Sequence, residues 1–159
     1  MEIERTMRSL ILLLALSSIA WSGGDVALLA RCAQGEAEIL GDEGMAAVLC
    51  VVGNRLESDL FPDDLPGVLA AFHGCGRIDE PSTDAVRLAL SLSSKRQGCD
   101  GYAGMVYAFS LQDARRLGLP YPDLRVPEEP LLAGGREWQL WLYEDIDWRA
   151  WHEEARSSR

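Results

Sequence analysis

The amino-acid sequence contains one carboxylate whose neighbours suit it for catalysis, Glu36. It lies between Gly35 and Ala37 near the predicted end of an apolar helix, and these small neighbours leave room for a bulky ligand. A carboxyl group in apolar surroundings keeps its proton more readily than one in water, so it can serve as a general acid. The alternative is a solvated glutamate at a helix end, which is the more common case.

Other kinds of active site have no support in this sequence. The chain of 159 residues has two histidines and contains no GxSxG, P-loop, HExxH or GxGxxG motif. Nucleophilic triads, phosphate-binding loops and zinc proteases are therefore not indicated. Its 25 acidic and 15 basic residues give a formal net charge of -10. Because binding to phosphates needs clustered Lys and Arg, we expect no nucleic-acid partner.

The elements that must position Glu36 are predicted to be mostly helices. Apolar residues at helical spacing, with caps such as Asp25 and Asp42, predict a helix before Glu36 and a strongly apolar, buried helix after it. Aromatic and β-branched residues at 105–109 predict one strand, and the prolines at 120–130 predict an extended connection. The predicted helices cover residues 25–36, 42–55, a short segment between the turn at 61–64 and residue 72, 83–93, 112–117 and 136–155.

Length and composition indicate one domain. A chain of 159 residues suits a single hydrophobic core. The content of 48% hydrophobic and 25% charged residues is typical of a globular protein. We therefore expect a mainly α (α+β) fold, with one domain over residues 23–159 and a small β element.

The first 22 residues resemble a secretory signal. The apolar stretch Leu10–Ala20 is too short to span a bilayer as a helix, and it follows Arg5 and Arg8. The small residues Ala20 and Ser22 form a site that a signal peptidase could cut before Gly23. The alternatives are a buried first helix and an uncleaved membrane anchor. We expect a secreted or periplasmic protein with 1–22 as its signal peptide.

The four cysteines agree with export. All four follow the expected cleavage site: Cys32, Cys50, Cys75 and Cys99. Four cysteines can form two disulfides, and three different pairings are possible. We expect at least one disulfide. A zinc site is the competing interpretation, but the spacing contains no CxxC and offers only His73 nearby. Ordinary buried thiols are the third possibility.

Several short motifs follow one another at a spacing that resembles that of a known family. They are Ala30-Arg31, Gly35-Glu36-Ala37, Glu43-Gly44, Ala47-Val48, Val51-Val52-Gly53-Asn54-Arg55, and later Gly101-Tyr102-Ala103-Gly104 with Tyr107 and Phe109. Residues 27–110 resemble the SleB/CwlJ family of bacterial cell-wall hydrolases. The resemblance implies a fold related to goose-type lysozymes and soluble transglycosylases, and cleavage of peptidoglycan between N-acetylmuramic acid and N-acetylglucosamine.

Glu36 matches the catalytic glutamate of the family. In a lytic transglycosylase this single group protonates the glycosidic oxygen and then removes a proton from the 6-hydroxyl of the sugar, which closes an anhydro ring. A hydrolase would need a second carboxylate about 5–9.5 Å away. Glu38, Asp42 and Glu43 are the local candidates, although Glu38 points to another face of the helix. No cofactor or metal is expected, and peptidoglycan strands are the expected partner, with a membrane contact only through an uncleaved signal segment.

The resemblance also suggests supporting residues, each with a structural alternative. Asn54 is expected to bind substrate or to cap its helix, and Arg55 to orient Glu36 or to form an ion pair. Tyr102 and Tyr107 are expected to contact the sugar near its developing positive charge, although Tyr107 also suits the core of a strand. Glu43 matches the family, but it also suits the first turn of a helix.

Departures from the family pattern predict a reshaped cleft. Glu38-Ile39 stands where the family commonly has Arg-Gly, and Ala71-Phe72 where it often has Gln-Phe. The net charge of -10 would also be repelled by an anionic cell wall. The alternative functions are a catalytically inactive wall-binding or structural envelope protein and a phage-type lysin with the same chemistry.

Tryptophans mark the predicted C-terminal helix. Their spacing places Trp138, Trp141, Trp148 and Trp151 near one helical face. Such a stripe is either a platform for sugar rings or, more commonly, a packing surface.

Overall fold

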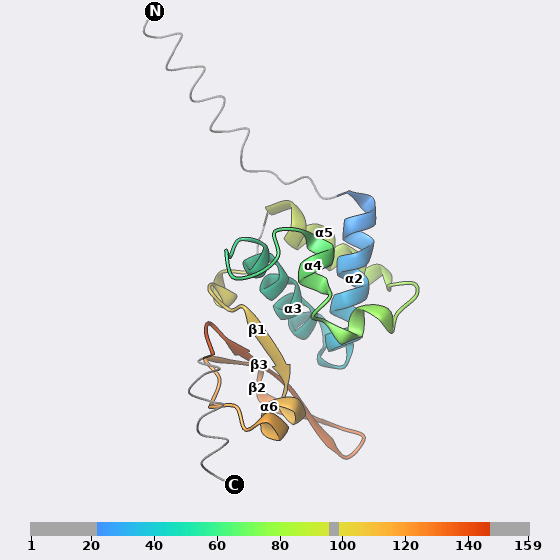
Figure 1. Ribbon diagram of the computed structural model, residues 1–159. Helices are drawn as coiled ribbons and strands as arrows, with labels where there is room; N and C mark the ends of the chain where they lie inside the picture. Colours follow the sequence, from blue (N-terminus) through green and yellow to red (C-terminus); the bar gives the residue numbers. More distant parts are fainter. Residues whose placement is uncertain (1–21, 96–98, 147–159) are drawn as a thin grey trace, which may run out of the picture.

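The computed structural model describes residues 22–95 and 99–146 and shows a helical body beside a small sheet (Figure 1). The described helices are α2 (Gly23–Ala37), α3 (Gly41–Leu56), α4 (Leu65–Leu69), α5 (Thr83–Lys95) and α6 (Leu111–Leu117), with the short 3₁₀ turns η1 (Glu38–Leu40), η2 (His73–Gly76) and η3 (Asp100–Tyr102). The mainly α fold with a small β element is confirmed. The stretch Leu10–Ala20 lies outside the described residues, and within the described part no helix is long and apolar enough to cross a membrane.

A local signal explains where α2 begins, whereas α3 begins at Gly41 without a side-chain cap, so Asp42 lies in its first turn and is not the predicted cap. The Ser22 hydroxyl accepts a hydrogen bond from the Asp25 backbone N–H, and the Asp25 carboxylate accepts one from the Ser22 backbone N–H. This reciprocal cap starts α2 at Gly23, so Asp25 lies inside the helix rather than at its cap. α3 is the buried helix that the sequence predicts, and it packs against both α2 and α5.

The C-terminal region is a β-hairpin, and the predicted helix over 136–155 is wrong where the structure describes it. Strands β2 (Leu124–Ala133) and β3 (Arg136–Tyr143) are antiparallel, and Gly134 and Gly135 form the turn with φ angles of 58° and 73°. Two adjacent glycines with positive φ suit a two-residue hairpin turn. The region predicted as an extended connection contains β2. Trp138 and Trp141 lie on β3, whereas Trp148 and Trp151 lie outside the described residues.

The described sheet contains three strands, two more than the sequence predicts. Strand β1 (Tyr107–Ser110) pairs with β3, which gives the order β1-β3-β2. Alternate residues of β3 face opposite sides of the sheet, as expected for a strand. Leu140 and Leu142 join the main helical core, whereas Trp141 and Tyr143 pack in a smaller cluster with Ala114 of α6. The sheet therefore lies between the helical body and α6.

Two disulfides join the helical body to the loops that follow it. Cys32 of α2 pairs with Cys75 of η2, and Cys50 of α3 pairs with Cys99 beside η3. The prediction of at least one disulfide is confirmed. All four cysteines are bonded, so the zinc and buried-thiol alternatives are wrong.

Candidate active site

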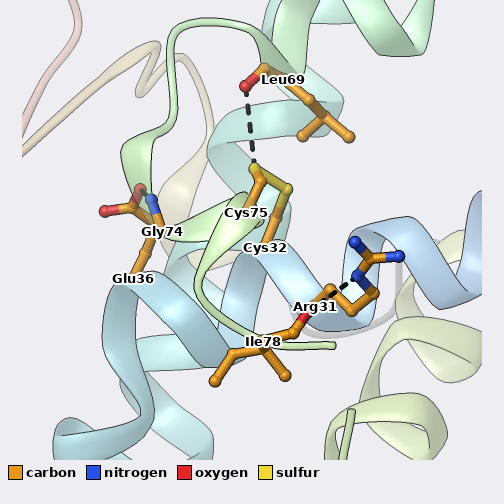
Figure 2. Close-up of a disulfide and its surroundings, with 7 residues drawn as sticks. All are labelled: Arg31, Cys32, Glu36, Leu69, Gly74, Cys75 and Ile78. Carbon is orange, nitrogen blue, oxygen red and sulfur yellow. Dashed lines mark hydrogen bonds between the residues drawn. A yellow bond between two sulfur atoms is a disulfide. The ribbon is translucent and has the colours of Figure 1, made fainter. Parts of the chain in front are cut away.

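Glu36 lies in the last turn of α2 and is half-buried. The backbone N–H of Gly74, in η2, donates a short hydrogen bond to Glu36 Oε1. Figure 2 shows the second carboxylate oxygen pointing away from Gly74. Within the described residues, Glu36 forms no other hydrogen bond or ion pair. One oxygen of Glu36 therefore accepts a hydrogen bond from the backbone, and the other is free to contact a ligand.

The hydrogen bond to Glu36 depends on a close approach of two backbone segments. A Cβ atom on Gly35 would lie 2.0 Å from the Gly74 carbonyl oxygen, so any side chain there would force η2 away from α2. The Cys32–Cys75 disulfide joins the same two segments, one helical turn before Glu36 and one residue after Gly74 (Figure 2). Glycine and disulfide together fix the loop that positions Glu36.

Glu36 lines a pocket of about 290 Å³ between the helical body, strand β1 and helix α6. The body provides the wall that carries Glu36, and the sheet with α6 provides the opposite wall. The lining residues are Glu36, Val48, Arg55, Ala71, Phe72, His73, Ala108, Phe109, Ser110, Asp113, Arg116, Leu117 and Leu140. Of the residues selected from the sequence, the structure brings Glu36 and Arg55 together in this pocket.

Arg55 forms a cationic part of the pocket wall. Its Nε donates a hydrogen bond of 2.6 Å to the Val106 carbonyl oxygen. Its guanidinium carbon lies 4.8 Å, 4.7 Å and 5.9 Å from the ring centroids of Phe61, Phe72 and Tyr107. Burial lowers the pKa of Arg55 below its ordinary value, while the nearby Tyr107 acts in the opposite direction. Arg55 and Glu36 do not form an ion pair, so Arg55 does not orient Glu36 by direct contact.

The remaining selected residues lie outside the described pocket lining. Asn54 donates hydrogen bonds of 2.8 Å to the carbonyl oxygens of Tyr102 and Met105, which ties α3 to the segment before β1. Tyr102 lies near Glu43, and its pKa is raised by burial and by the negative charge of Glu43. The ring of Tyr107 packs on Phe61 at 5.7 Å. These contacts favour structural roles for Asn54 and Tyr107.

The three local candidates for a second carboxylate also lie outside the pocket lining. Glu38 accepts a hydrogen bond of 2.9 Å from Gln34, and Asp42 lies 3.9 Å from Arg87 on the surface. Glu43 is exposed in the first turn of α3, where its charge favours the helix dipole. The departure Glu38-Ile39 is likewise exposed, whereas Ala71 and Phe72 line the pocket.

The structure adds a polar group on the opposite wall that sequence reasoning missed. The Ser110 hydroxyl accepts a hydrogen bond from the Asp113 backbone N–H at 3.1 Å and donates one to Asp113 Oδ2 at 2.8 Å. Arg116 lies 2.8 Å from Asp113 Oδ1. The sequence signal was present, because Ser-x-x-Asp predicts a helix that begins after the serine. Its location opposite Glu36 depends on strand pairing, which the local signal does not reveal.

No protein-family model matches the sequence, and no curated protein matches it. A solved structure of the catalytic domain of the SleB protein from Bacillus cereus does match, with 26% sequence identity and a TM-score of 0.51. The chain has a SleB-like fold. The match covers 59% of this chain and 76% of the SleB chain. It confirms the resemblance that the spaced motifs around Glu36 indicate.

The SleB-like fold and the two disulfides are consistent with a location outside the cytoplasm. Among residues 22–95 and 99–146, no group of three His, Cys, Asp or Glu side chains is arranged to hold a metal ion.

Proposed function

We propose that this protein is a cell-wall lytic enzyme that cleaves peptidoglycan strands between N-acetylmuramic acid and N-acetylglucosamine, with Glu36 as the general acid. The likeness to the SleB catalytic domain supports the class of activity. The observation that carries the role of Glu36 is its carboxylate in the pocket, with one oxygen bonded to the Gly74 N–H and the other free. The other residues selected from the sequence are proposed only to support the site and not to take part in the proton transfer. They are Glu43, Asn54, Arg55, Tyr102 and Tyr107.

The hydrogen bond from Gly74 supports one oxygen of Glu36, Oε2, as the proposed site of the proton. A backbone N–H can only donate, so Oε1 must act as an acceptor in every protonation state. When Glu36 is protonated, the proton therefore belongs on Oε2, the oxygen that points away from Gly74. This arrangement presents an O–H donor to a glycosidic oxygen bound in the pocket, which general acid catalysis requires.

Two reaction routes start from this proton transfer. Glu36 gives its proton to the glycosidic oxygen, the bond from that oxygen to the sugar C1 breaks, and positive charge develops on the sugar ring. In one route the Glu36 carboxylate then takes a proton from the 6-hydroxyl of the same sugar, whose oxygen bonds to C1 to form an anhydro ring. In the other route it takes a proton from a water molecule, whose oxygen bonds to C1.

The charges of the pocket favour the route through an anhydro ring. A hydrolase with two carboxylates needs a second one that is free to act on water or on the sugar. Asp113 is the second carboxylate in the lining, but its two oxygens are occupied by Ser110 and Arg116. Among the lining residues that the structure describes, Glu36 is thus the carboxylate with a free oxygen, and one is enough for transglycosylation.

Mass spectrometry of the soluble products from purified peptidoglycan tests this proposal. We expect muropeptides that end in an anhydro sugar. Products that have gained water would show that the enzyme is a hydrolase and not a transglycosylase. Asp113 would then be the second carboxylate to test. If no soluble product appears, an inactive wall-binding or structural envelope protein becomes the better description.

We also propose that the protein acts outside the cytoplasm and that residues 1–22 direct its export. The proposed substrate lies there, and disulfides persist in oxidising compartments. Cleavage before Gly23 would remove Ser22, which caps α2, and would place a new amino group at the helix N-terminus. N-terminal sequencing of the exported protein tests both points: an intact N-terminus would contradict the signal, and a cut before Ser22 would preserve the cap.

A further inference from the structure

Arg55 is the charged group of the pocket that the proposed proton transfer does not use. Arg55 as a whole residue is 8% exposed, yet it forms no ion pair with any described carboxylate. Burial removes the water that stabilises a charge, so a buried guanidinium is normally paired with an anion. The rings of Phe61, Phe72 and Tyr107 compensate this loss only in part.

The hydrogen-bond donors of Arg55 are mostly unused. A guanidinium has five N–H groups, and the described structure uses the one on Nε, which donates to Val106. The terminal nitrogens donate to no described group. No fully buried side-chain nitrogen or oxygen of the described residues lacks a partner, so these nitrogens are not sealed in the core. Because Arg55 lines the pocket, a ligand can reach them from there.

The charges of the pocket leave Arg55 uncompensated during the first step of the reaction. Asp113 and Arg116 neutralise each other as an ion pair of 2.8 Å. When Glu36 carries the proton that it donates, Arg55 is the permanently charged group of the described lining that has no ion-pair partner. The pocket is thus locally cationic in a chain whose net charge is -10. This contrast favours an anionic group of the ligand over a neutral one at this position.

We propose that Arg55 binds a carboxylate of the substrate in this pocket, so that the enzyme prefers glycan with a free carboxylate near the cleaved bond. The inference rests on the proposed function and names the substrate group that the pocket selects. The two terminal nitrogens of a guanidinium can donate parallel hydrogen bonds to one carboxylate. Peptidoglycan offers such a group in two places: the lactyl group of N-acetylmuramic acid after removal of the peptide, and the peptide stem itself.

A comparison of paired substrates with the unmodified protein tests the inference. One pair consists of strands without peptides and the same strands with their carboxylates converted to amides, and the other pair consists of peptide-bearing strands treated in the same way. We expect amidation to raise KM about tenfold in at least one pair, the loss expected for a hydrogen bond to a charged group. A rise in the peptide-free pair assigns the lactyl carboxylate, and a rise confined to the peptide-bearing pair assigns the stem.

The opposite result is equally clear. If KM is the same within about twofold in both pairs, Arg55 does not select a carboxylate and the inference is wrong. If no strand of either pair is cleaved, the proposed function itself fails, which is a different outcome.

A pair of variants links the effect to Arg55. Arg55→Gln should remove the preference for carboxylate-bearing strands. Arg115→Gln should retain it, because Arg115 is an exposed arginine paired with Glu137 and lies outside the pocket lining. Thermal unfolding establishes which variants fold. A folded Arg55→Gln protein that still prefers the carboxylate would overturn the inference, and if this variant does not fold, the substrate pairs decide alone.

Discussion

Gly35 and Gly74 pack backbone against backbone at the point where Glu36 receives its hydrogen bond. A Cβ atom on Gly74 would lie 2.4 Å from the carbonyl carbon of Gly35 and 2.6 Å from the backbone nitrogen of Glu36. The reverse contact, from a Cβ on Gly35 to the Gly74 carbonyl oxygen, would be shorter still. The position of the Glu36 carboxylate therefore depends on two residues that have no side chain.

Gly35→Ala should reduce both stability and activity. The added methyl group has to displace the backbone of η2, and such overpacking costs about 1–3 kcal/mol or more. The displacement also moves the Gly74 N–H away from Glu36. Urea unfolding measures the first effect, and the initial rate of muropeptide release from folded protein measures the second.

Gly76→Ala is the matched control, because it lies in the same turn with no atom within 4 Å of the added methyl group. It should change the free energy of unfolding by less than about 0.5 kcal/mol. Equal effects of the two substitutions would contradict the role of the Gly35–Gly74 contact.

Removal of either disulfide should lower the stability of the protein by a similar amount, but the two removals should affect its activity differently. Their sequence separations are 43 and 49 residues, so the chain-entropy model assigns about 4 kcal/mol to each. Only the Cys32–Cys75 bond joins the two segments that meet at Glu36. We expect the Cys32→Ser/Cys75→Ser double variant to lose more of its kcat than Cys50→Ser/Cys99→Ser, when both are assayed below their unfolding transitions. A larger loss in the second double variant would argue against this positioning role.

Asn54 provides a test between binding substrate and supporting the fold. Its side-chain amide donates to the carbonyl oxygens of Tyr102 and Met105. Asn54→Ala leaves both acceptors without this partner, which should lower the free energy of unfolding by about 1–3 kcal/mol. We expect KM to stay within about twofold for the protein that remains folded. Unchanged chemical denaturation together with a raised KM would restore the interpretation of Asn54 as a substrate ligand.

Tyr143 should make the fold sensitive to alkaline pH. Burial, with the negative charge of Asp123 nearby, raises its pKa from 10.0 to about 12, and its hydroxyl donates to the Pro120 carbonyl oxygen at 2.9 Å. A group whose pKa is higher in the folded than in the unfolded protein contributes stability that is complete below the unfolded pKa. That contribution should fall as the pH rises from about 10 to about 12.

The variant Tyr143→Phe isolates this effect. It loses the hydrogen bond at neutral pH, which costs about 1 kcal/mol, and it should show a flatter decline of stability above pH 10. Parallel pH profiles of unfolding for the two proteins would show that Tyr143 does not titrate as described.

The helical body was predictable because its signals are local. Apolar spacing predicted α2 and α3, and a helix was also predicted over 83–93, where α5 lies. The hairpin was not predicted because Trp138 and Trp141 are separated by three residues, a spacing that also fits a helix. The alternation of Leu140 and Leu142 with Trp141 and Tyr143, together with Gly134-Gly135, was the better signal.

The opposite wall of the pocket was beyond local reasoning. Asp113 and Arg116 line the same pocket as Glu36 because β1 pairs with β3 and α6 follows β1 directly. No spacing in the sequence encodes that pairing. Likewise, the free donors of Arg55 follow from the rings and the carbonyl group that surround it, and these come from three separate segments.

The most direct test of the account compares Glu36→Gln with Glu38→Gln on purified peptidoglycan. Glutamine keeps an oxygen that can accept from the Gly74 N–H but has no acidic proton, so we expect the release of soluble muropeptides to fall by about 10²–10⁴-fold. Glu38 is exposed and accepts a hydrogen bond from Gln34, so its substitution should leave the rate of muropeptide release nearly unchanged. A Glu36→Gln protein that releases muropeptides at the rate of the unmodified protein would contradict the assignment of Glu36 as the acid.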